Sequence, residues 1–321
     1  MSQGSSVVME DVGSTAAIGV HSADHFAFAV PELDVATRFY TDFGLDVRQA
    51  ADCGLELYTF DNPHCWVKIS QGAEGSSKKL RYLSFGAYQQ DMPEFERRLN
   101  ERKIERCAPL NDDGGLWFKS PDGLPLQIKV AEKSSPDTKS HFISPSAEPG
   151  RAGAAPKAVA PAAKPRRLSH VAIFVADMDE ALDFYADILG LRLSDRCGNH
   201  ISFVHGIHGS DHHLLALVGS THTGLHHMSW DLPSVHDVGV SSQCMIDKGY
   251  TEGWGLGRHL LGSNYFYYVQ DPWNSYSEYI ADMDYVPAGH DWPSADHEPG
   301  EVFSYWGPRS PKKFPQNFEA A

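Results

Sequence analysis

The sequence predicts an α+β fold in which two similar halves each form a curled mixed sheet around a cavity. Three observations lead to this prediction. Strands with alternating apolar residues are interleaved with short amphipathic helices. The two halves of the chain share their order of elements and the spacing of marked residues. A segment without hydrophobic periodicity separates the halves.

The order of elements is the same at the start of each half. The first half opens with DHFAFAVPELDVATRFYTDFGLDV and the second with SHVAIFVADMDEALDFYADILGLRL. Each segment predicts an alternating strand, a turn that carries Asp, an amphipathic helix that ends near Gly, and another strand. Further strands with period-2 alternation are expected over His200–His205 and His213–Val218. Each half is therefore expected to contain tandem βαβββ modules with the helices on one face of the sheet.

Equal spacings relate the later parts of the two halves. His25 and Tyr82 lie 57 residues apart, and so do His170 and His227. Near the end of each half, SPDGLPLQIKV matches DPWNSYSEYIA. Shared spacing at this level indicates duplication of one ancestral unit.

Composition places the domain boundaries. The chain has 321 residues, enough for two domains with real cores. Residues 132–166 are rich in Pro and Ala and are expected to form a linker between domains at 20–131 and 167–285. Residues 1–19 are expected to form a mobile N-terminal arm. Residues 286–321 form a C-terminal extension whose tryptophans and prolines predict packing over the domain or a neighbouring subunit.

Charge and composition exclude several classes of function. A formal net charge of −15 argues against a nucleic-acid partner, because phosphate binding needs a clustered basic face. No stretch approaches the ~20 apolar residues of a membrane span, so no membrane association is expected. The N-terminal segment lacks the basic start and apolar run of a secretion signal, which predicts a cytoplasmic protein. The five cysteines are scattered without CxxC spacing, so neither a zinc knot nor a disulfide framework is expected.

Comparison of the matched positions yields a candidate metal site in the second half alone. The second half carries two histidines and a carboxylate, namely His170, His227 and Glu278. The first half carries His25, Tyr82 and Gln127 at the corresponding positions. Two imidazoles and one carboxylate form the facial triad typical of non-haem Fe(II) oxygenases, which leaves coordination positions open for substrate and O2. Tyrosine and glutamine bind Fe(II) poorly, so the N-terminal domain is expected to lack a metal site.

These motifs resemble the type I extradiol ring-cleavage dioxygenases of the vicinal oxygen chelate superfamily, the glyoxalase-like fold. The resemblance is carried by LSHVAIFV around His170, by GLHHMSWDL around His227, and by GRHLLGSNYFYYVQDPWNSYSEY around Glu278. It covers both halves of the chain. The linker is longer than expected for the family, and the tail HDWPSADHEPGEVFSYWGP is unlike its best-known members.

The resemblance also implies three catalytic residues. A catalytic histidine in the family pattern HxxA falls on His213, with Ala216 three residues on and the neighbouring His212 as the competing choice. A further histidine and a tyrosine nine residues later fall on His259 and Tyr268, and Glu278 follows ten residues after the tyrosine.

Other residues near these motifs receive weaker assignments. Strand alternation predicts that His226 points away from His227 and is structural. His200 and His205 are expected near the site, where they would touch substrate. Several aromatic residues are candidates to shape an apolar pocket, although most are expected to be core: Phe203, Trp230, Phe266, Trp273 and Tyr276.

The resemblance implies extradiol cleavage of a catechol-type aromatic with O2 to a 2-hydroxymuconate-semialdehyde-type product, in aromatic catabolism. The cofactor expected is Fe(II), with Mn(II) open because the same triad binds both. A homo-oligomer, tetramer or dimer, is expected from family habit. Three alternatives stay open at this point: a 4-hydroxyphenylpyruvate-type dioxygenase, a glyoxalase-like isomerase, and a metal-free module that binds an aromatic compound.

Overall fold

The computed structural model describes residues 18–143, 147–154, 163–299 and 303–319. In the first half the strands are β1 (Ser22–Val30), β2 (Asp46–Gln49), β3 (Leu55–Thr59), β4 (Asn62–Gln71), β5 (Lys79–Ala87), β6 (Leu116–Lys119) and β7 (Pro125–Val130). Its helices are α1 (Leu33–Phe43), the short 3-10 helix η1 (Gln89–Asp91) and α2 (Met92–Glu101).

The second half repeats this order and adds strands. Its helices are α3 (Met178–Leu189) and α4 (Val235–Asp247). Its strands are β8 (Arg167–Val175), β9 (Arg192–Cys197), β10 (Ile201–His205), β11 (Ser210–Asp211), β12 (Leu215–Gly219), β13 (Gly224–Asp231), β14 (Gly253–Arg258), β15 (Tyr265–Gln270), β16 (Tyr276–Ala281), β17 (Tyr285–Val286) and β18 (Ala295–Asp296).

The two sheets have the same central arrangement. The first runs β2-β3-β4-β1-β5-β7-β6 and the second β14-β15-β16-β13-β8-β12-β10-β9-β18. In each, the two central strands are antiparallel to one another, β1 with β5 and β8 with β13, and each has a parallel neighbour on its other side. The predicted α+β class with duplicated halves is confirmed.

Registers of individual residues repeat as well. In the second sheet Ser229 lies opposite His170 on one side and opposite Glu278 on the other. In the first sheet Ser84 lies opposite His25 and Gln127 in the same way. The residues matched by spacing in the sequence therefore occupy equivalent places in the two sheets.

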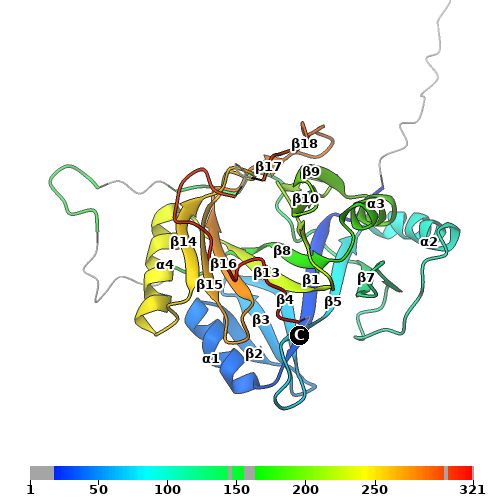
Figure 1. The fold of residues 1–321 in the computed structure, drawn as a ribbon, viewed down its shortest axis with the longest axis horizontal. Helices are drawn as coiled ribbons and strands as arrows, with labels where there is room; N and C mark the ends of the chain where they lie inside the picture. Colours follow the sequence, from blue (N-terminus) through cyan, green and yellow to red (C-terminus); the bar gives the residue numbers. More distant parts are fainter. Residues whose placement is uncertain (1–17, 144–146, 155–162, 300–302, 320–321) are drawn as a thin grey trace, which may run out of the picture.

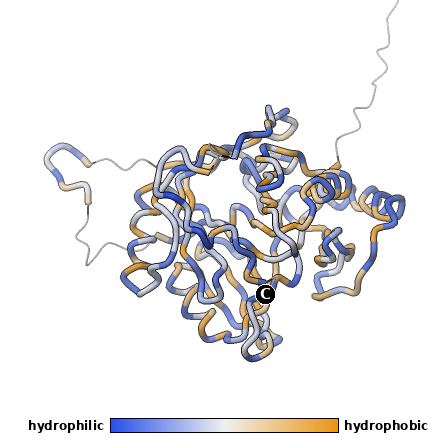
Figure 2. Tube along the Cα trace, viewed as in Figure 1, coloured by the Kyte–Doolittle hydropathy of each residue, from blue (hydrophilic) through white to orange (hydrophobic). Residues whose placement is uncertain are grey.

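Local sequence signals account for the boundaries of the first helix of each half. The Asp177 side chain accepts a hydrogen bond from the backbone of Glu180 and so caps the start of α3. Gly44 and Gly190 end α1 and α3 with φ angles of 100° and 72°, a left-handed conformation that glycine adopts without strain. Along the tube of Figure 2, the helices alternate between hydrophilic and hydrophobic residues, as expected where one helix face packs on a sheet. In Figure 1, α4 flanks β14 and β15, and α3 flanks β9 and β10.

The two halves share one hydrophobic core. One continuous cluster of buried aromatic and aliphatic residues includes members of both sheets, beside smaller separate clusters. At the junction, the rings of Phe43 and Tyr279 stack with centroids 3.9 Å apart, and the Tyr279 hydroxyl donates a 2.7 Å hydrogen bond to the Phe43 carbonyl. Lys78 of the first half forms a buried ion pair of 2.6 Å with Asp271 of the second. The halves are therefore fastened to one another by apolar packing and by a buried charge pair.

The described part of the C-terminal tail, residues 286–299 and 303–319, lies against the second sheet. The short strand β18 pairs in parallel with β9. Trp306 exchanges backbone hydrogen bonds with Arg258. The Glu319 carboxylate accepts hydrogen bonds from the backbone of Leu80 and of Leu225, one in each half. The expected N-terminal arm lies almost wholly outside the described residues. In the part of the chain that is described, no helix is long and apolar enough to cross a membrane.

Candidate active site

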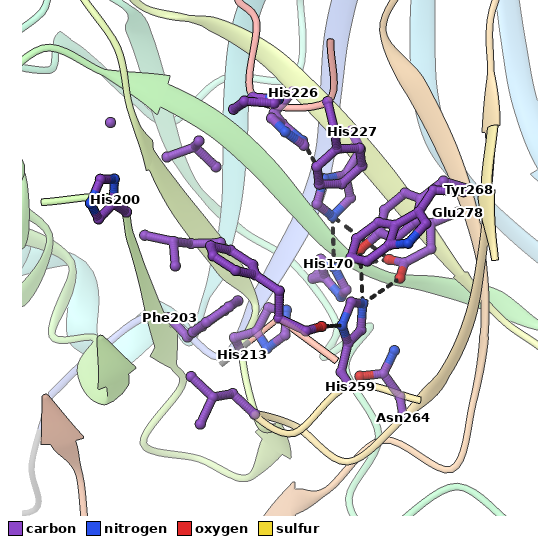
Figure 3. A pocket seen from close by; sticks show the side chains of 18 of the residues that line it. His170, His200, Phe203, His213, His226, His227, His259, Asn264, Tyr268 and Glu278 are labelled. Carbon is purple, nitrogen blue, oxygen red and sulfur yellow. Dashed lines mark hydrogen bonds and ion pairs between the residues drawn. The ribbon is translucent and has the colours of Figure 1, made fainter. Parts of the chain in front are cut away.

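A cavity of about 280 Å³ lies inside the curl of the second sheet. Its lining is mostly aromatic and aliphatic, with a group of histidines and one carboxylate at its base. Figure 3 shows these polar side chains pointing toward one another from several strands. The lining residues are His170, His200, Ile201, Phe203, His213, Val218, Gly219, His226, His227, Trp254, His259, Leu261, Asn264, Tyr268, Glu278, Pro299, Phe303, Phe314 and Pro315.

Three neighbouring strands bring the predicted metal ligands together. His170 comes from β8, His227 from β13 and Glu278 from β16, and these strands are adjacent in the sheet. The Nε2 atoms of the two histidines are 3.1 Å apart. The Glu278 Oε2 atom lies 3.5 Å from Nε2 of His170 and 3.6 Å from Nε2 of His227. Among the described residues, these three form the group of His, Cys, Asp or Glu side chains that could hold a metal ion.

The donor set fits a divalent metal ion. Adjacent ligands of an octahedral ion, each ~2.1 Å from the centre, stand roughly 3 Å apart, close to the separations observed. Both carboxylate oxygens of Glu278 are buried and lack a hydrogen-bond partner within the described structure. A buried carboxylate without a partner is costly, and a cation between these three side chains would balance its charge.

Electrostatics favour the protonation states that metal binding needs. Burial and the neighbouring His226 hold the pKa of His227 well below its ordinary value, so that the imidazole is neutral. Burial alone would raise the pKa of Glu278, but the adjacent His170 imidazole lowers it well below its usual range. Neutral imidazoles and an ionised carboxylate are the ligand forms that coordinate a metal.

The equivalent residues of the first half are hydrogen-bonded within the protein. His25 donates from Nδ1 to the Asp24 carboxylate at 2.7 Å, and its Nε2 is 3.1 Å from the Tyr82 hydroxyl. The Gln127 amide donates to the Gly114 carbonyl at 2.6 Å, and Asn111 donates to both Tyr82 and Gln127. These hydrogen bonds occupy the polar atoms that would otherwise face a metal. That the N-terminal domain binds no metal stays a prediction.

The two adjacent histidines His212 and His213 point to different surroundings. His213 lines the cavity, and its ring centroid lies 4.0 Å from that of His170 (Figure 3). Burial and the surrounding histidines hold the pKa of His213 well below its ordinary value, so its imidazole is neutral. His212 is fully buried, is not among the lining residues, and is hydrogen-bonded to Asp195. The arrangement favours His213 over His212 as the residue that meets substrate.

His259 and Tyr268 form a hydrogen-bonded pair beside the candidate metal ligands. The Tyr268 hydroxyl lies 3.1 Å from Nε2 of His259, and that Nε2 lies 3.4 Å from Oε1 of Glu278. Nδ1 of His259 is 2.5 Å from the carbonyl oxygen of Phe303, in the C-terminal tail. Because a carbonyl only accepts, Nδ1 of His259 carries the proton and Nε2 accepts from Tyr268.

The prediction that His226 points away from the site is wrong. Both His226 and His227 line the cavity, and their Nδ1 atoms are 2.6 Å apart. The cause is a register shift between Leu225 and His227 in the pairing of β13 with β8. Such an irregularity interrupts the alternation of side chains and lets two consecutive residues face the same side.

Some of the other residues assigned from the sequence line the cavity and others do not. His200 lines the cavity, whereas His205 is hydrogen-bonded to Ser194 and is not in the lining. Of the aromatic candidates only Phe203 lines the cavity; the others are buried elsewhere in the described structure: Trp230, Phe266, Trp273 and Tyr276.

The C-terminal tail forms part of the cavity wall, which the sequence did not predict. Phe303 and Phe314, together with Pro299 and Pro315, close one side of the cavity. Phe314 packs against the rings of Trp254 and Tyr268, with centroids 4.8 Å from each. The aromatic content of the tail was the available signal, and it indicated packing without indicating which surface.

Comparisons with known proteins agree with this geometry. The family described as "Glyoxalase/Bleomycin resistance protein/Dioxygenase superfamily" matches residues 167–279. Metapyrocatechase 2 of Cupriavidus necator is 46% identical over 303 residues, which cover 94% of this chain and 93% of that protein. The manganese-dependent 2,3-dihydroxybiphenyl 1,2-dioxygenase of Geobacillus genomosp. 3 is 22% identical, with coverage of 88% and 93%. Among solved structures, the Mn(II)-bound glyoxalase from Novosphingobium aromaticivorans superposes with a TM-score of 0.71 at 22% identity, covering 90% of this chain and 91% of that one.

Proposed function

This chain belongs to the metapyrocatechases, the extradiol catechol dioxygenases of the glyoxalase/dioxygenase superfamily, and from that premise we propose that it opens a neutral catechol at an Fe(II) ion held by His170, His227 and Glu278. The family membership confirms the resemblance seen in the sequence, and with it extradiol cleavage as the enzyme's reaction. It also argues against the three alternatives, a 4-hydroxyphenylpyruvate-type dioxygenase, a glyoxalase-like isomerase and a metal-free binding module. We further propose the identity of the metal ion, the roles of the site residues and the substituents that the substrate carries.

One observation carries the metal assignment. Two imidazole nitrogens and a carboxylate oxygen converge to 3.1–3.6 Å in a buried position where the carboxylate has no hydrogen-bond partner among described residues. The triad suits Fe(II) and Mn(II) alike. Fe(II), when bound there, would supply a Lewis acid that binds both catechol oxygens and O2 on its open side and allows electrons to pass between them.

The protein side chains would then place protons. His213, neutral and in the cavity, accepts a proton from the substrate hydroxyl and returns it when the O–O bond breaks. Tyr268 and His259 hydrogen-bond the substrate oxygen nearest to them and hold it in place. The apolar walls exclude water from the reacting ring. Cleavage beside the diol would give a 2-hydroxymuconate-semialdehyde-type product.

The cavity lining supports a neutral substrate. Apart from the histidines, Glu278 is the charged residue of the described lining, and no Arg or Lys belongs to it. A catechol with an acidic substituent would therefore bring an unpaired charge into an apolar space. Unsubstituted or hydrocarbon-substituted catechols fit the wall formed by Phe203, Trp254 and Phe314.

Several expectations stay predictions. These are the homo-oligomeric assembly as tetramer or dimer, the cytoplasmic location, and the functional division of the chain at 20–131, 132–166 and 167–285, with a C-terminal extension from 286.

The test begins with protein stripped of metal and reloaded with Fe(II) or Mn(II) without oxygen. Addition of catechol and air is expected to give O2 uptake in step with a yellow ring-opened product near neutral pH. Absence of O2 uptake with every neutral catechol tried, at full metal loading, would overturn the proposal. His213→Phe is expected to retain the metal while turnover falls by ~10²-fold or more. Loss of metal in that variant would show that the roles are misassigned.

A further inference from the structure

His212, next to the candidate acid-base residue His213, lies at the start of a hydrogen-bonded chain that leaves the cavity. Nδ1 of His212 is 3.1 Å from Nδ1 of His213. On its other side, Nε2 of His212 is 2.9 Å from Oδ2 of Asp195. Oδ1 of Asp195 is in turn 2.7 Å from Nε2 of His297, whose side chain is 29% exposed. The chain thus runs from the cavity wall through the sheet to the surface of the C-terminal tail.

The chain determines which nitrogen of each imidazole carries a proton. A carboxylate only accepts hydrogen bonds, so Nε2 of His212 is protonated where it meets Asp195. A neutral His212 then has a bare Nδ1, which accepts a hydrogen bond from Nδ1–H of His213. This leaves Nε2 of His213 with its lone pair free. A free lone pair on that nitrogen is the form that a general base requires.

Hydrogen bonds and burial fix the positions of His212 and Asp195, the two central members of this hydrogen-bonded chain. His212 is fully buried, and its backbone N–H donates to the Asp284 carbonyl at 2.7 Å. The Ser194 hydroxyl donates to the His212 carbonyl. Burial would raise the pKa of Asp195, but hydrogen bonds from His212 and His297 lower it below its usual value, so the carboxylate is charged.

The C-terminal tail supplies the partners of Asp195. The indole N–H of Trp292 donates to Oδ2 at 3.3 Å, and the Ala295 backbone N–H donates to Oδ1 at 3.3 Å. Parallel pairing of β18 with β9 sets Ala295 opposite Asp195. Three residues of this tail segment, Trp292, Ala295 and His297, thus hydrogen-bond one buried carboxylate.

We propose that Asp195 is a positioning residue for ring cleavage: it sets the tautomer of His212 and through it that of His213, and the tail residues Trp292 and His297 hold Asp195 in place. The inference rests on the role proposed above for His213. It gives the tail segment a function in the reaction. Asp195 would act as a carboxylate that orients a catalytic imidazole, with the imidazole of His212 between the two.

The test replaces the carboxylate by its isosteric amide, Asp195→Asn. The amide can donate to Nε2 of His212, which would reverse both tautomers and put a proton on Nε2 of His213. Turnover of the Fe(II)-loaded variant at saturating catechol is expected to fall ~10–100-fold, with KM within about threefold and metal content unchanged. The matched control is Asp296→Asn, which removes the carboxylate that follows Ala295 in β18 and pairs with Arg196 instead. The control is expected to keep full turnover.

A second readout is independent of activity. Histidine ¹⁵N NMR of the metal-free full-length protein distinguishes protonated from bare ring nitrogens, with His213 identified by comparison with His213→Phe. Bare Nε2 on His213 in the wild type and protonated Nε2 in Asp195→Asn are expected. If Asp195→Asn does not fold, His212→Gln takes its place, because it removes the partner of His213 Nδ1 and predicts the same loss of turnover.

The outcomes separate the two proposals. Wild-type turnover and an unchanged His213 spectrum in a folded Asp195→Asn variant would overturn the positioning role and leave the role of His213 intact. Normal turnover of His213→Phe would instead overturn the proposed role of His213, and the positioning role with it. A tautomer change without loss of turnover would also count against the inference.

Discussion

His226 and His227 are consecutive in the chain, yet both face the cavity, with their Nδ1 atoms 2.6 Å apart. For His227 to offer its Nε2 lone pair to a metal, its Nδ1 must carry the proton and donate it to His226. His226 therefore serves as the hydrogen-bond acceptor that orients a metal-binding imidazole, a place usually taken by a carboxylate or a backbone carbonyl.

Replacement of His226 by phenylalanine is expected to weaken metal binding. The variant keeps an aromatic ring against Phe314 but removes the acceptor for His227, which should cost ~10–100-fold in metal affinity. Competition with a chelator measures this directly. His200→Phe is the matched control, because His200 is an exposed cavity histidine with no contact to the candidate ligands. An unaltered affinity in His226→Phe would contradict the orienting role.

Glu278→Gln gives the second half the residue that the first half carries as Gln127. An amide replaces the one anionic ligand, so the protein is expected to lose its bound metal on dialysis and all measurable ring cleavage. Metal content by atomic spectroscopy provides the measurement. His25→Ala, at the position equivalent to His170, should leave one metal per chain; loss of metal in that variant would mean that the first half takes part in binding.

Neutral and acidic catechols should be discriminated strongly. The described lining holds no Arg or Lys, so a carboxylate on the ring would be buried without a partner, at a cost of several kcal/mol. We expect kcat/KM for a catechol with an acetic acid substituent to be at least about 100-fold below that for its methyl ester. The ester is the control for size. Equal values for acid and ester would show that a cation reaches the cavity.

Stability is expected to fall as the pH drops from about 6.5 to 4. Burial lowers the pKa of His21 to about 4 and the pKa of His205 to about 4, whereas both ionise near 6.5 in the unfolded chain. The unfolded state therefore binds more protons in this window, and the unfolding free energy decreases by on the order of 1 kcal/mol per pH unit for each group. Below pH 4 this contribution is fully lost.

Urea titrations at pH 7, 5.5 and 4.5 provide the measurement for this pH dependence. His21→Gln should flatten the slope relative to the wild type, because it removes one of the two groups. A slope that is unchanged in His21→Gln would refute the assignment to that residue.

Much of the site was predictable because the chain contains its own comparison. His170, His227 and Glu278 stood out once His25, Tyr82 and Gln127 were set beside them, and equal spacing within a duplicated unit places side chains at equivalent points of a sheet. The sequence left His212 as the competing choice to His213, and the choice between them stays a prediction, which the place of His213 in the cavity lining supports.

Other features depend on contacts that no local pattern carries. The His226 side chain faces the cavity because β13 is irregular between Leu225 and His227. An irregularity of one residue does not change the hydrophobic periodicity of the sequence, so it could not be predicted. Phe303 and Phe314 reach the cavity through a folded-back tail, with contacts far away in sequence. The tail partners of Asp195, Trp292 and His297, are likewise about a hundred residues distant.

The stacking of Phe43 on Tyr279 packs the two duplicated halves against one another. Tyr279 directly follows Glu278 on β16, and consecutive strand residues face opposite sides, so one holds the first half while the other faces the cavity. A fragment that starts at residue 163 would lose the partner of Tyr279 and the partner of the buried Asp271. The half that has no ligand triad of its own thus supplies contacts that hold β16, and with it Glu278, in the half that has one.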